Sequence, residues 1–251
     1  MLTAYLDESG HETKGWMFVA GFLGNDDQWK QFVPLWKDAL GPKRKHLHMA
    51  NLRWKKQRTK ELLARLGAVP NKCRLTPVVG GVKAADYEDL IQGTPAEKLL
   101  KGYIACIYPL VINVLRVIPK NERLEIVFEE QKEYELYTKC ALSALVSIRH
   151  IRPDWFLTED GLPKLAKWSF VPKGSTMLTE PADCFVYALR HLYQDKNSKQ
   201  TQWCKPILDS GDGTGIGAIM EREAMREQMM KVPFMAIYAQ VMTQLGKFKA
   251  P

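Results

Sequence analysis

The stretch Tyr5-Leu6-Asp7-Glu8-Ser9-Gly10 decides the expected fold, because a short apolar run stops there at two adjacent carboxylates and a turn. Residues 2–7 are predicted to form a β-strand, whose side chains alternate between two faces. This alternation places Asp7 and Glu8 on opposite faces, so that one of them enters any given site. Acidic residues at a strand end suggest metal chemistry, although Asp, Ser and Gly also terminate strands and build turns.

Strands and helices alternate along the rest of the chain. A polar turn at residues 10–15 and an apolar run at 16–22 predict a hairpin with the first strand. Further strands are expected at 75–79, 124–128 and 168–171, and helices at 26–40, 51–66, 95–115, 133–148 and from 180. Residues 194–203 and the Gly-rich segment 210–217 are expected to be loops. A strand, a helix and a second strand in succession indicate a crossover unit, and therefore an α/β fold.

Length and composition limit the possible classes of protein. The chain has 251 residues, 46% of them hydrophobic, which suffices for one large domain or one domain with an appendage. Its net charge of +8 favours polyanionic partners such as nucleic acid. Five widely spaced cysteines indicate reduced thiols rather than a disulfide framework or a zinc site. Without a signal peptide or a long apolar segment, we expect a cytoplasmic protein that does not enter the membrane.

Two further acidic residues have settings similar to that of Asp7. Glu129 ends the strand at 124–128, and Asp183 falls in the first turn of a helix that Pro181 begins. Carboxylates from strand ends and a helix start can converge, and such hard oxygen ligands suit Mg²⁺ or Mn²⁺. Each residue also has a structural interpretation: closing a turn, ending a strand in solvent, or complementing the helix dipole.

These motifs resemble those of the bacterial and phage family catalogued as domain of unknown function 3800. The opening stretch at residues 5–10 resembles the first motif, Phe128-Glu129-Glu130 the second and Glu180-Pro181-Ala182-Asp183 the third. The resemblance covers about residues 2–193. The chain departs from the family pattern at Glu129, where aspartate is usual, and at Glu180-Pro181, which replaces Gln-Leu.

The resemblance implies a ribonuclease H-like fold, in which acidic residues of the first strand, the fourth strand and a late helix bind divalent metal. Asp7, Glu129 and Asp183 fall at these positions and are the expected catalytic residues and metal ligands. The supporting or alternative ligands are expected to be Glu8, Glu130 and Glu180.

The expected architecture is an α/β domain with a ribonuclease H-like mixed sheet flanked by helices and carrying helical insertions, at residues 1–203. A C-terminal helical appendage is expected to pack on this domain at residues 204–251. The expected function is metal-dependent hydrolysis of nucleic-acid phosphodiester bonds with Mg²⁺ or Mn²⁺ as cofactor. Two alternatives are a non-catalytic nucleic-acid-binding or effector protein that retains the fold, and a metal-dependent hydrolase of a nucleotide-sized substrate.

Basic residues and two histidines complete the candidate site. Lys and Arg side chains that are candidates for contacts with the nucleic-acid backbone are Lys43, Arg44, Lys55, Lys56 and Arg58. A charge run of this kind is also typical of a solvated helix face. His46 and His48 flank Leu47 and share a face if the segment is extended. They are the candidates for an accessory base, with a structural or solvated role as the alternative.

Overall fold

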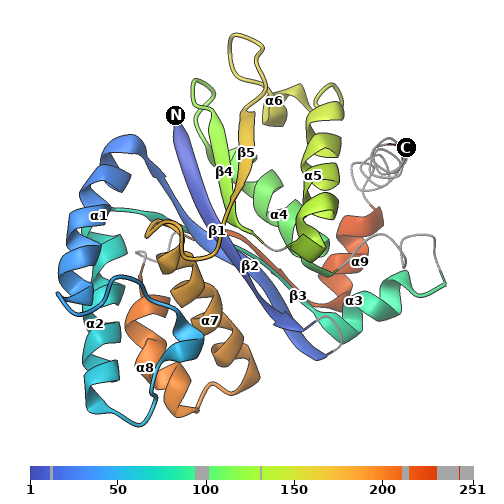
Figure 1. The fold of residues 1–251 in the computed structure, drawn as a ribbon. Helices are drawn as coiled ribbons and strands as arrows, with labels where there is room; N and C mark the ends of the chain where they lie inside the picture. The colour runs from blue at the N-terminus through green and yellow to red at the C-terminus, as the bar shows by residue number, and fades with distance from the viewer. Residues whose placement is uncertain (12–13, 94–101, 131, 211–214, 231–242, 244–251) are drawn as a thin grey trace.

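The fold is built on a six-stranded mixed sheet (Figure 1). The computed structural model describes residues 1–11, 14–93, 102–130, 132–210, 215–230 and 243. In sheet order the strands are β5 (Leu165–Val171), β4 (Leu124–Glu129), β1 (Leu2–His11), β2 (Lys14–Asn25), β3 (Thr76–Lys83) and β6 (Ile216–Met220). Strand β4 lies between β1 and β5 and is parallel to both. Strand β2 is antiparallel to β1 and β3, and β6 is parallel to β3. The predicted α/β class and the β1–β2 hairpin are confirmed.

One face of the sheet is covered by α3 (Ala84–Ile91), α4 (Gly102–Val117) and α5 (Lys132–Ser147). Leu6 of β1 and Ile126 of β4 are fully buried on this side, as period-two alternation requires. Helix α4 lies directly on β3, because a Cβ atom at Gly80 would stand 1.9 Å from the carbonyl oxygen of Cys106. Gly80 therefore permits the close packing of α4, and β3 runs through Gly80 and Gly81 to Lys83 instead of ending at Val79 as predicted.

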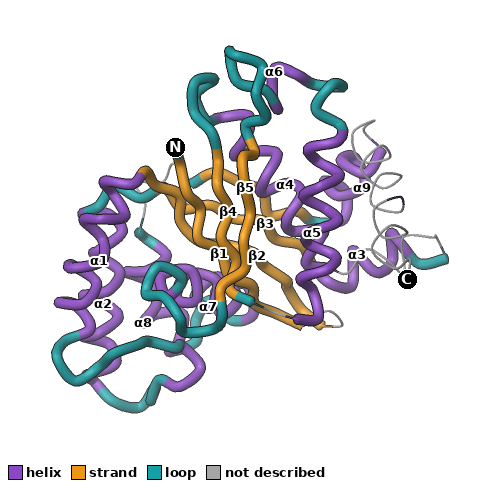
Figure 2. Tube along the Cα trace, turned by 45° about the horizontal axis from the view of Figure 1, so that its top comes forward, coloured by secondary structure: helices purple, strands orange, loops and turns teal. Residues whose placement is uncertain are grey.

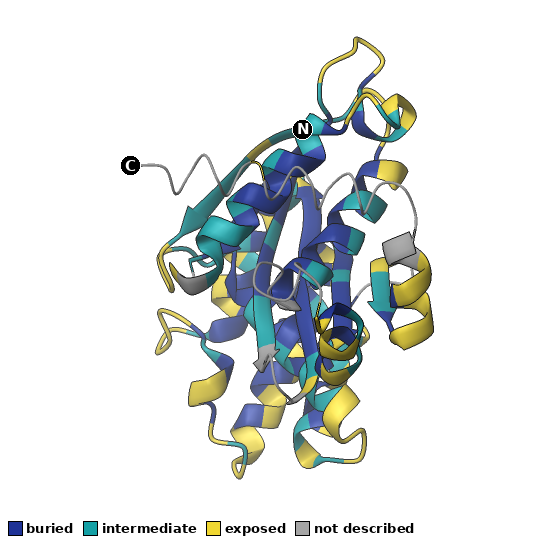
Figure 3. Ribbon diagram, turned by 90° about the vertical axis from the view of Figure 1, so that its right-hand side faces the viewer, coloured by how far each residue is buried: buried dark blue, intermediate teal, exposed yellow. Residues whose placement is uncertain are grey.

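The other face is covered by α7 (Glu180–Gln194), with α1 (Asp26–Leu40), α2 (Gln57–Lys72) and α8 (Lys199–Leu208) beyond it (Figure 2). Helix α1 has the predicted boundaries, and Asn25 forms a capping box with Gln28 at its start. The buried side of α1 carries Trp29, Phe32 and Trp36. Figure 3 shows the buried strands between helices whose outer surfaces are exposed.

Three helix predictions on this side were wrong. Helix α8 lies where a loop was predicted: Ser198 caps it by accepting a hydrogen bond from the Thr201 N–H, and Trp203 is buried among neighbouring apolar residues. Helix α2 begins at Gln57 because the preceding residues form a short 3-10 helix, η1 (Met49–Asn51). Helix α7 starts at residue 180 as predicted, but its N-cap is Thr179, whereas Glu180 was the expected N-cap.

The C-terminal part of the description adds β6 and α9 (Arg222–Met230). Strand β6 replaces part of the predicted Gly-rich loop, whose residues 211–214 lie outside the described residues. The boundary predicted after residue 203 falls inside α8. The remaining helix, α6 (Pro153–Phe156), precedes β5. No helix within the described ranges is both long and apolar enough to cross a membrane.

Candidate functional site

Three elements bring the predicted carboxylates to one end of the sheet. Leu6 of β1 is paired with Phe128 of β4, so the next residues, Asp7 and Glu129, are neighbours on parallel strands. Helix α7 packs on β1 and β2 and carries Asp183 in its first turn. Figure 1 shows β1, β4 and α7 side by side, and the charges of Glu129 and Asp183 act on Asp7, so three carboxylates from distant parts of the sequence lie in one region.

Asp7 is the most electrostatically strained member of this carboxylate cluster, which we define as Asp7, Glu129 and Asp183. Only 4% of Asp7 is exposed, and its Oδ1 accepts a hydrogen bond of 2.9 Å from the Glu8 N–H. Burial raises the pKa of Asp7 well above its usual value, and the negative charges of Glu8, Asp183 and Glu129 raise it further. An ionised Asp7 therefore requires a nearby cation.

Glu129 is contacted by the segment that joins β5 to α7. The Lys173 ammonium lies 3.4 Å from Glu129 Oε2, and the Gly174 N–H donates to Oε1 over 3.4 Å. Partial burial lowers the pKa of Lys173, but attraction by Glu129, Asp7 and Asp183 outweighs it and the net pKa is raised. Lys173 was missed in the sequence. Its position just after β5, the strand beside β4, was the available signal.

Asp183 is held by the segment before η1. Its Oδ2 accepts a hydrogen bond of 2.8 Å from the Met49 N–H and lies 3.1 Å from His48 Nδ1. The side chain of His48 is partly exposed. These contacts fix one carboxylate oxygen of Asp183 and attach the segment at residues 43–49 to the start of α7.

Glu180 is tied to the same segment, but in a different way. Its Oε2 accepts a hydrogen bond of 2.7 Å from Trp36 Nε1, and its Oε1 lies 3.3 Å from His46 Nδ1. Burial raises the pKa of Glu180 above its usual value, and hydrogen bonds from Trp36, the Leu47 N–H and His46 offset only part of this rise. Both oxygens therefore have protein partners. His46 and His48, the candidates for an accessory base, contact two different carboxylates of α7.

Glu8 and Glu130 occupy the positions next to the cluster. Strand β1 continues to His11, so alternation turns Glu8 to the face opposite Asp7, where its charge still raises the pKa of Asp7. Glu130 follows β4, and its N–H donates to the Val171 carbonyl oxygen. The structure thus favours Glu8 and Glu130 as residues beside the carboxylate cluster rather than as members of it.

The donor set suits a hard divalent cation. Asp7, Glu129 and Asp183 supply carboxylate oxygens, the ligands that Mg²⁺ and Mn²⁺ prefer. The surplus of negative charge around Asp7 also favours a cation there. Among the described residues, however, no group of three or more His, Cys, Asp or Glu side chains lies in an arrangement that could hold a metal ion.

The predicted nucleic-acid contacts lie on the segment attached to Asp183. Lys43 and Arg44 are exposed before His46, and the exposed residues after η1 include Lys55, Lys56 and Arg58. Between these groups, the ring of Trp54 stacks on that of Tyr187, at 5.4 Å between centroids and 3° between planes. Tyr187 lies about one turn after Asp183 on α7. The exposed basic residues thus flank, in sequence, the residues that contact α7 through Asp183 and Tyr187.

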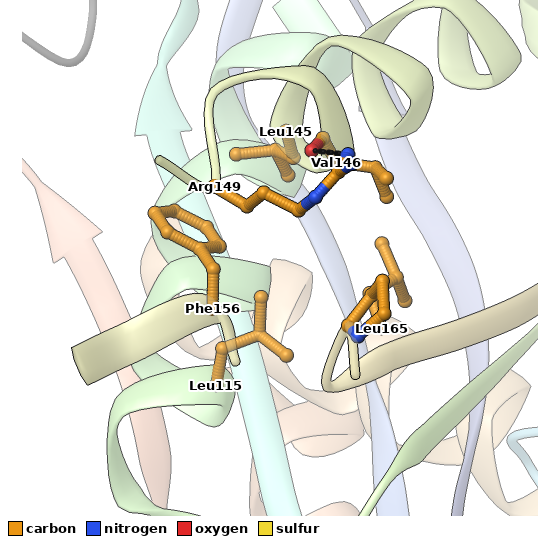
Figure 4. A pocket seen from close by; sticks show the side chains of 7 residues that line it. Leu115, Leu145, Val146, Arg149, Phe156 and Leu165 are labelled. Atoms are coloured by element: carbon orange, nitrogen blue, oxygen red, sulfur yellow. Dashed lines mark hydrogen bonds between the residues drawn. The ribbon is translucent and has the colours of Figure 1, made fainter. Parts of the chain in front are cut away.

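A pocket elsewhere in the protein has a different character (Figure 4). It lies beside α4 and α5, on the sheet face opposite α7. The residues that line it are Leu115, Leu145, Val146, Arg149, Phe156, Pro163 and Leu165. The polar member, Arg149, donates a hydrogen bond to the Val146 carbonyl oxygen. This lining is that of core packing and supplies no carboxylate.

Comparison with known proteins gives no assignment. No protein-family model matches the chain. No curated protein matches its sequence significantly. The functional interpretation therefore rests on the geometry and the charges of the site.

Proposed function

We propose that this protein is a divalent-metal-dependent nuclease with a ribonuclease H-like fold. The observation that carries the proposal is the environment of Asp7, a carboxylate whose pKa is raised by its burial and further by the charges of Glu8, Asp183 and Glu129. Groups strained in this way concentrate at functional sites, because such strain has no benefit for folding.

The topology supports the fold assignment. The resemblance to the uncharacterised family implies acidic residues on the first strand, the fourth strand and a late helix. Asp7 lies on β1, Glu129 ends β4 and Asp183 begins α7. Strand β1 lies at the centre of the five strands β5-β4-β1-β2-β3, with β2 antiparallel to its neighbours.

The proposed metal ligands are Asp7, Glu129 and Asp183. A bound Mg²⁺ or Mn²⁺ would activate water and stabilise the leaving oxygen of a phosphodiester. The protein's own contribution is positional: adjacent strands set the spacing of Asp7 and Glu129, and the Met49 N–H orients Asp183. His48, partly exposed beside Asp183, is placed to accept a proton at the margin of the site.

Charge supports nucleic acid as the substrate class. The protein carries a net charge of +8, although its proposed catalytic site is acidic. Lys43, Arg44, Lys55, Lys56 and Arg58 are exposed on the segments around η1, where phosphate contacts would be strongly salt-dependent. The partly exposed Trp54 and Tyr187 offer aromatic surface of the kind on which nucleic-acid bases stack.

Cleavage by an Asp7→Asn variant tests this proposal. The side chains are nearly the same size, so we expect the fold to persist and Mn²⁺-dependent cleavage of DNA or RNA to fall by more than about a hundredfold. Asp27→Asn, an identical change at an exposed position on α1, is the matched control and is expected to cleave normally. Wild-type cleavage rates in the Asp7→Asn variant would overturn the assignment.

One observation favours the non-catalytic alternative. Asp183 Oδ2 and both oxygens of Glu129 already have protein partners, as expected of carboxylates that organise loops. A protein of this kind would bind nucleic acid equally well in EDTA and would not cleave it with Mg²⁺ or Mn²⁺. Measuring oligonucleotide affinity and cleavage on the same samples distinguishes the two functions.

A further inference from the structure

We propose that Lys173 is a built-in counter-ion of the carboxylate cluster and competes with the divalent metal for Glu129. The inference rests on the proposed function, because it concerns the same metal-binding site. It adds a residue that tunes how strongly the site takes up metal.

The geometry places Lys173 directly against a proposed metal ligand. Residues 172–179 connect β5 to α7, and Lys173 and Gly174 in this connection each contact one oxygen of Glu129 at the end of β4. The Gly174 contact comes from the backbone and does not depend on the lysine side chain. Removing the lysine head group therefore leaves an anchor that keeps the segment in place.

The charges explain why a lysine stands there. The Lys173 ammonium is attracted by Glu129, Asp7 and Asp183, so one cation interacts with all three members of the cluster. A divalent cation would occupy the same region of negative potential with twice the charge. The metal ion and the ammonium repel each other, so each would weaken the binding of the other to the carboxylate cluster.

The exposure of Lys173 makes this contact reversible. Its side chain is 55% exposed, whereas that of Glu129 is 9% exposed. A lysine on a flexible stem can leave for solvent at little cost, and partly exposed ion pairs contribute weakly to stability. Glu129 remains in place when Lys173 departs, and the released ammonium is then free to bind a phosphate oxygen of the substrate.

The same pair of strands provides a matched control. Lys167 on β5 lies 2.9 Å from Glu125 on β4, in a lysine–glutamate bridge at the other end of the strands. The Lys167 side chain is 66% exposed, comparable to that of Lys173. Replacing either lysine by methionine removes one positive charge and one bridge, but the change at Lys173 alone affects the cluster.

The experiment compares Mn²⁺ binding to wild type, Lys173→Met and Lys167→Met by calorimetric titration and by the rise of Tm with Mn²⁺. We expect Lys173→Met to bind Mn²⁺ about fivefold more tightly and to gain more Tm, in line with the loss of a partly exposed ion pair. Lys167→Met is expected to match wild type. Unchanged or weakened Mn²⁺ binding in Lys173→Met would overturn the inference, as would equal gains in both variants.

The outcomes also separate this inference from the proposed function. If wild type binds Mn²⁺, Asp7→Asn does not, and Lys173→Met is unchanged, the metal site stands and the counter-ion role fails. If Lys173→Met binds Mn²⁺ and wild type does not, the counter-ion role is supported in its strongest form. If neither protein binds Mn²⁺, both proposals fail.

Discussion

Asp7 and Glu180 are two equally buried carboxylates, each 4% exposed, with opposite surroundings. Glu180 is met by hydrogen bonds from Trp36, the Leu47 N–H and His46. Asp7 accepts a hydrogen bond from the Glu8 N–H and faces the charges of three carboxylates. Burial is the same in both cases, so burial alone does not distinguish an anchor from a proposed catalytic group.

This difference shows that the groups around a buried carboxylate, hydrogen-bond donors or like charges, indicate whether it serves as a structural anchor or as a proposed catalytic group. Burial raises the pKa of both carboxylates, but the hydrogen-bond donors around Glu180 offset part of this rise, whereas the like charges around Asp7 add to it. Glu180 therefore belongs to the framework that holds the start of α7, although it was expected as an alternative metal ligand. Asp7 retains its place at the centre of the proposed site.

Glu180→Ala should give the largest effect on stability. The change leaves the indole N–H of Trp36 and the Leu47 N–H without their buried acceptor, and we expect a loss of about 2–4 kcal/mol in the free energy of unfolding. Urea denaturation measures it, with Glu61→Ala at an exposed position of α2 as control. A loss below about 1 kcal/mol would show that Glu180 is no anchor.

Asp7→Asn should instead increase the free energy of unfolding. The change removes a buried charge that is repelled by Glu8, Asp183 and Glu129, so the metal-free protein at pH 7 should gain about 1 kcal/mol. The same variant is expected to lose cleavage, so stability and activity should move in opposite directions. Equal destabilisation of Asp7→Asn and Glu180→Ala would remove the distinction between the two carboxylates.

The pH dependence of this gain follows from the raised pKa of Asp7. Its pKa in the folded protein lies well above the usual 3.8, so folding favours the protonated form. The resulting stabilisation is fully present below pH 3.8 and is lost as pH rises toward the raised value. The stability advantage of Asp7→Asn over wild type should therefore grow as pH rises above about 4. Urea midpoints of the two proteins at several pH values, in EDTA, test this sign.

His46→Ala should have the smallest effect. The side chain of His46 is 54% exposed, and Trp36 and the Leu47 N–H still satisfy Glu180 without it. We expect a loss of no more than about 0.5 kcal/mol. A loss as large as that of Glu180→Ala would transfer the anchoring role from the buried indole to the histidine.

Local sequence patterns were sufficient to predict much of the framework. Strand β4 ends at Glu129, β1 carries Asp7, and Pro181 lies in the first turn of α7, so the elements that carry Asp7, Glu129 and Asp183 were visible in the sequence, although β1 runs on to His11 instead of ending at Asp7 as predicted. Asn25 gave the start of α1 for the same local reason.

Features that depend on contacts between distant parts of the chain could not be predicted from local sequence patterns. The partner of Glu180, Trp36, lies 144 residues away in sequence, and no local pattern links the two. Lys173 reaches Glu129 only because β5 pairs with β4. Strand β6 is a short glycine-containing segment that depends on its pairing with β3. Helix α8 combines a polar start with apolar residues that find burial only in the folded protein.

The distribution of the carboxylates along the chain has a consequence during synthesis. Asp7 leaves the ribosome early, Glu129 follows near the middle and Asp183 comes last, with the helix that closes over β1 and β2. Parallel pairing of β1 with β4 must also wait until residues 124–129 have been made. A nascent chain that stops before α7 therefore lacks Asp183, and the proposed metal site can be complete only in molecules whose translation has passed residue 183.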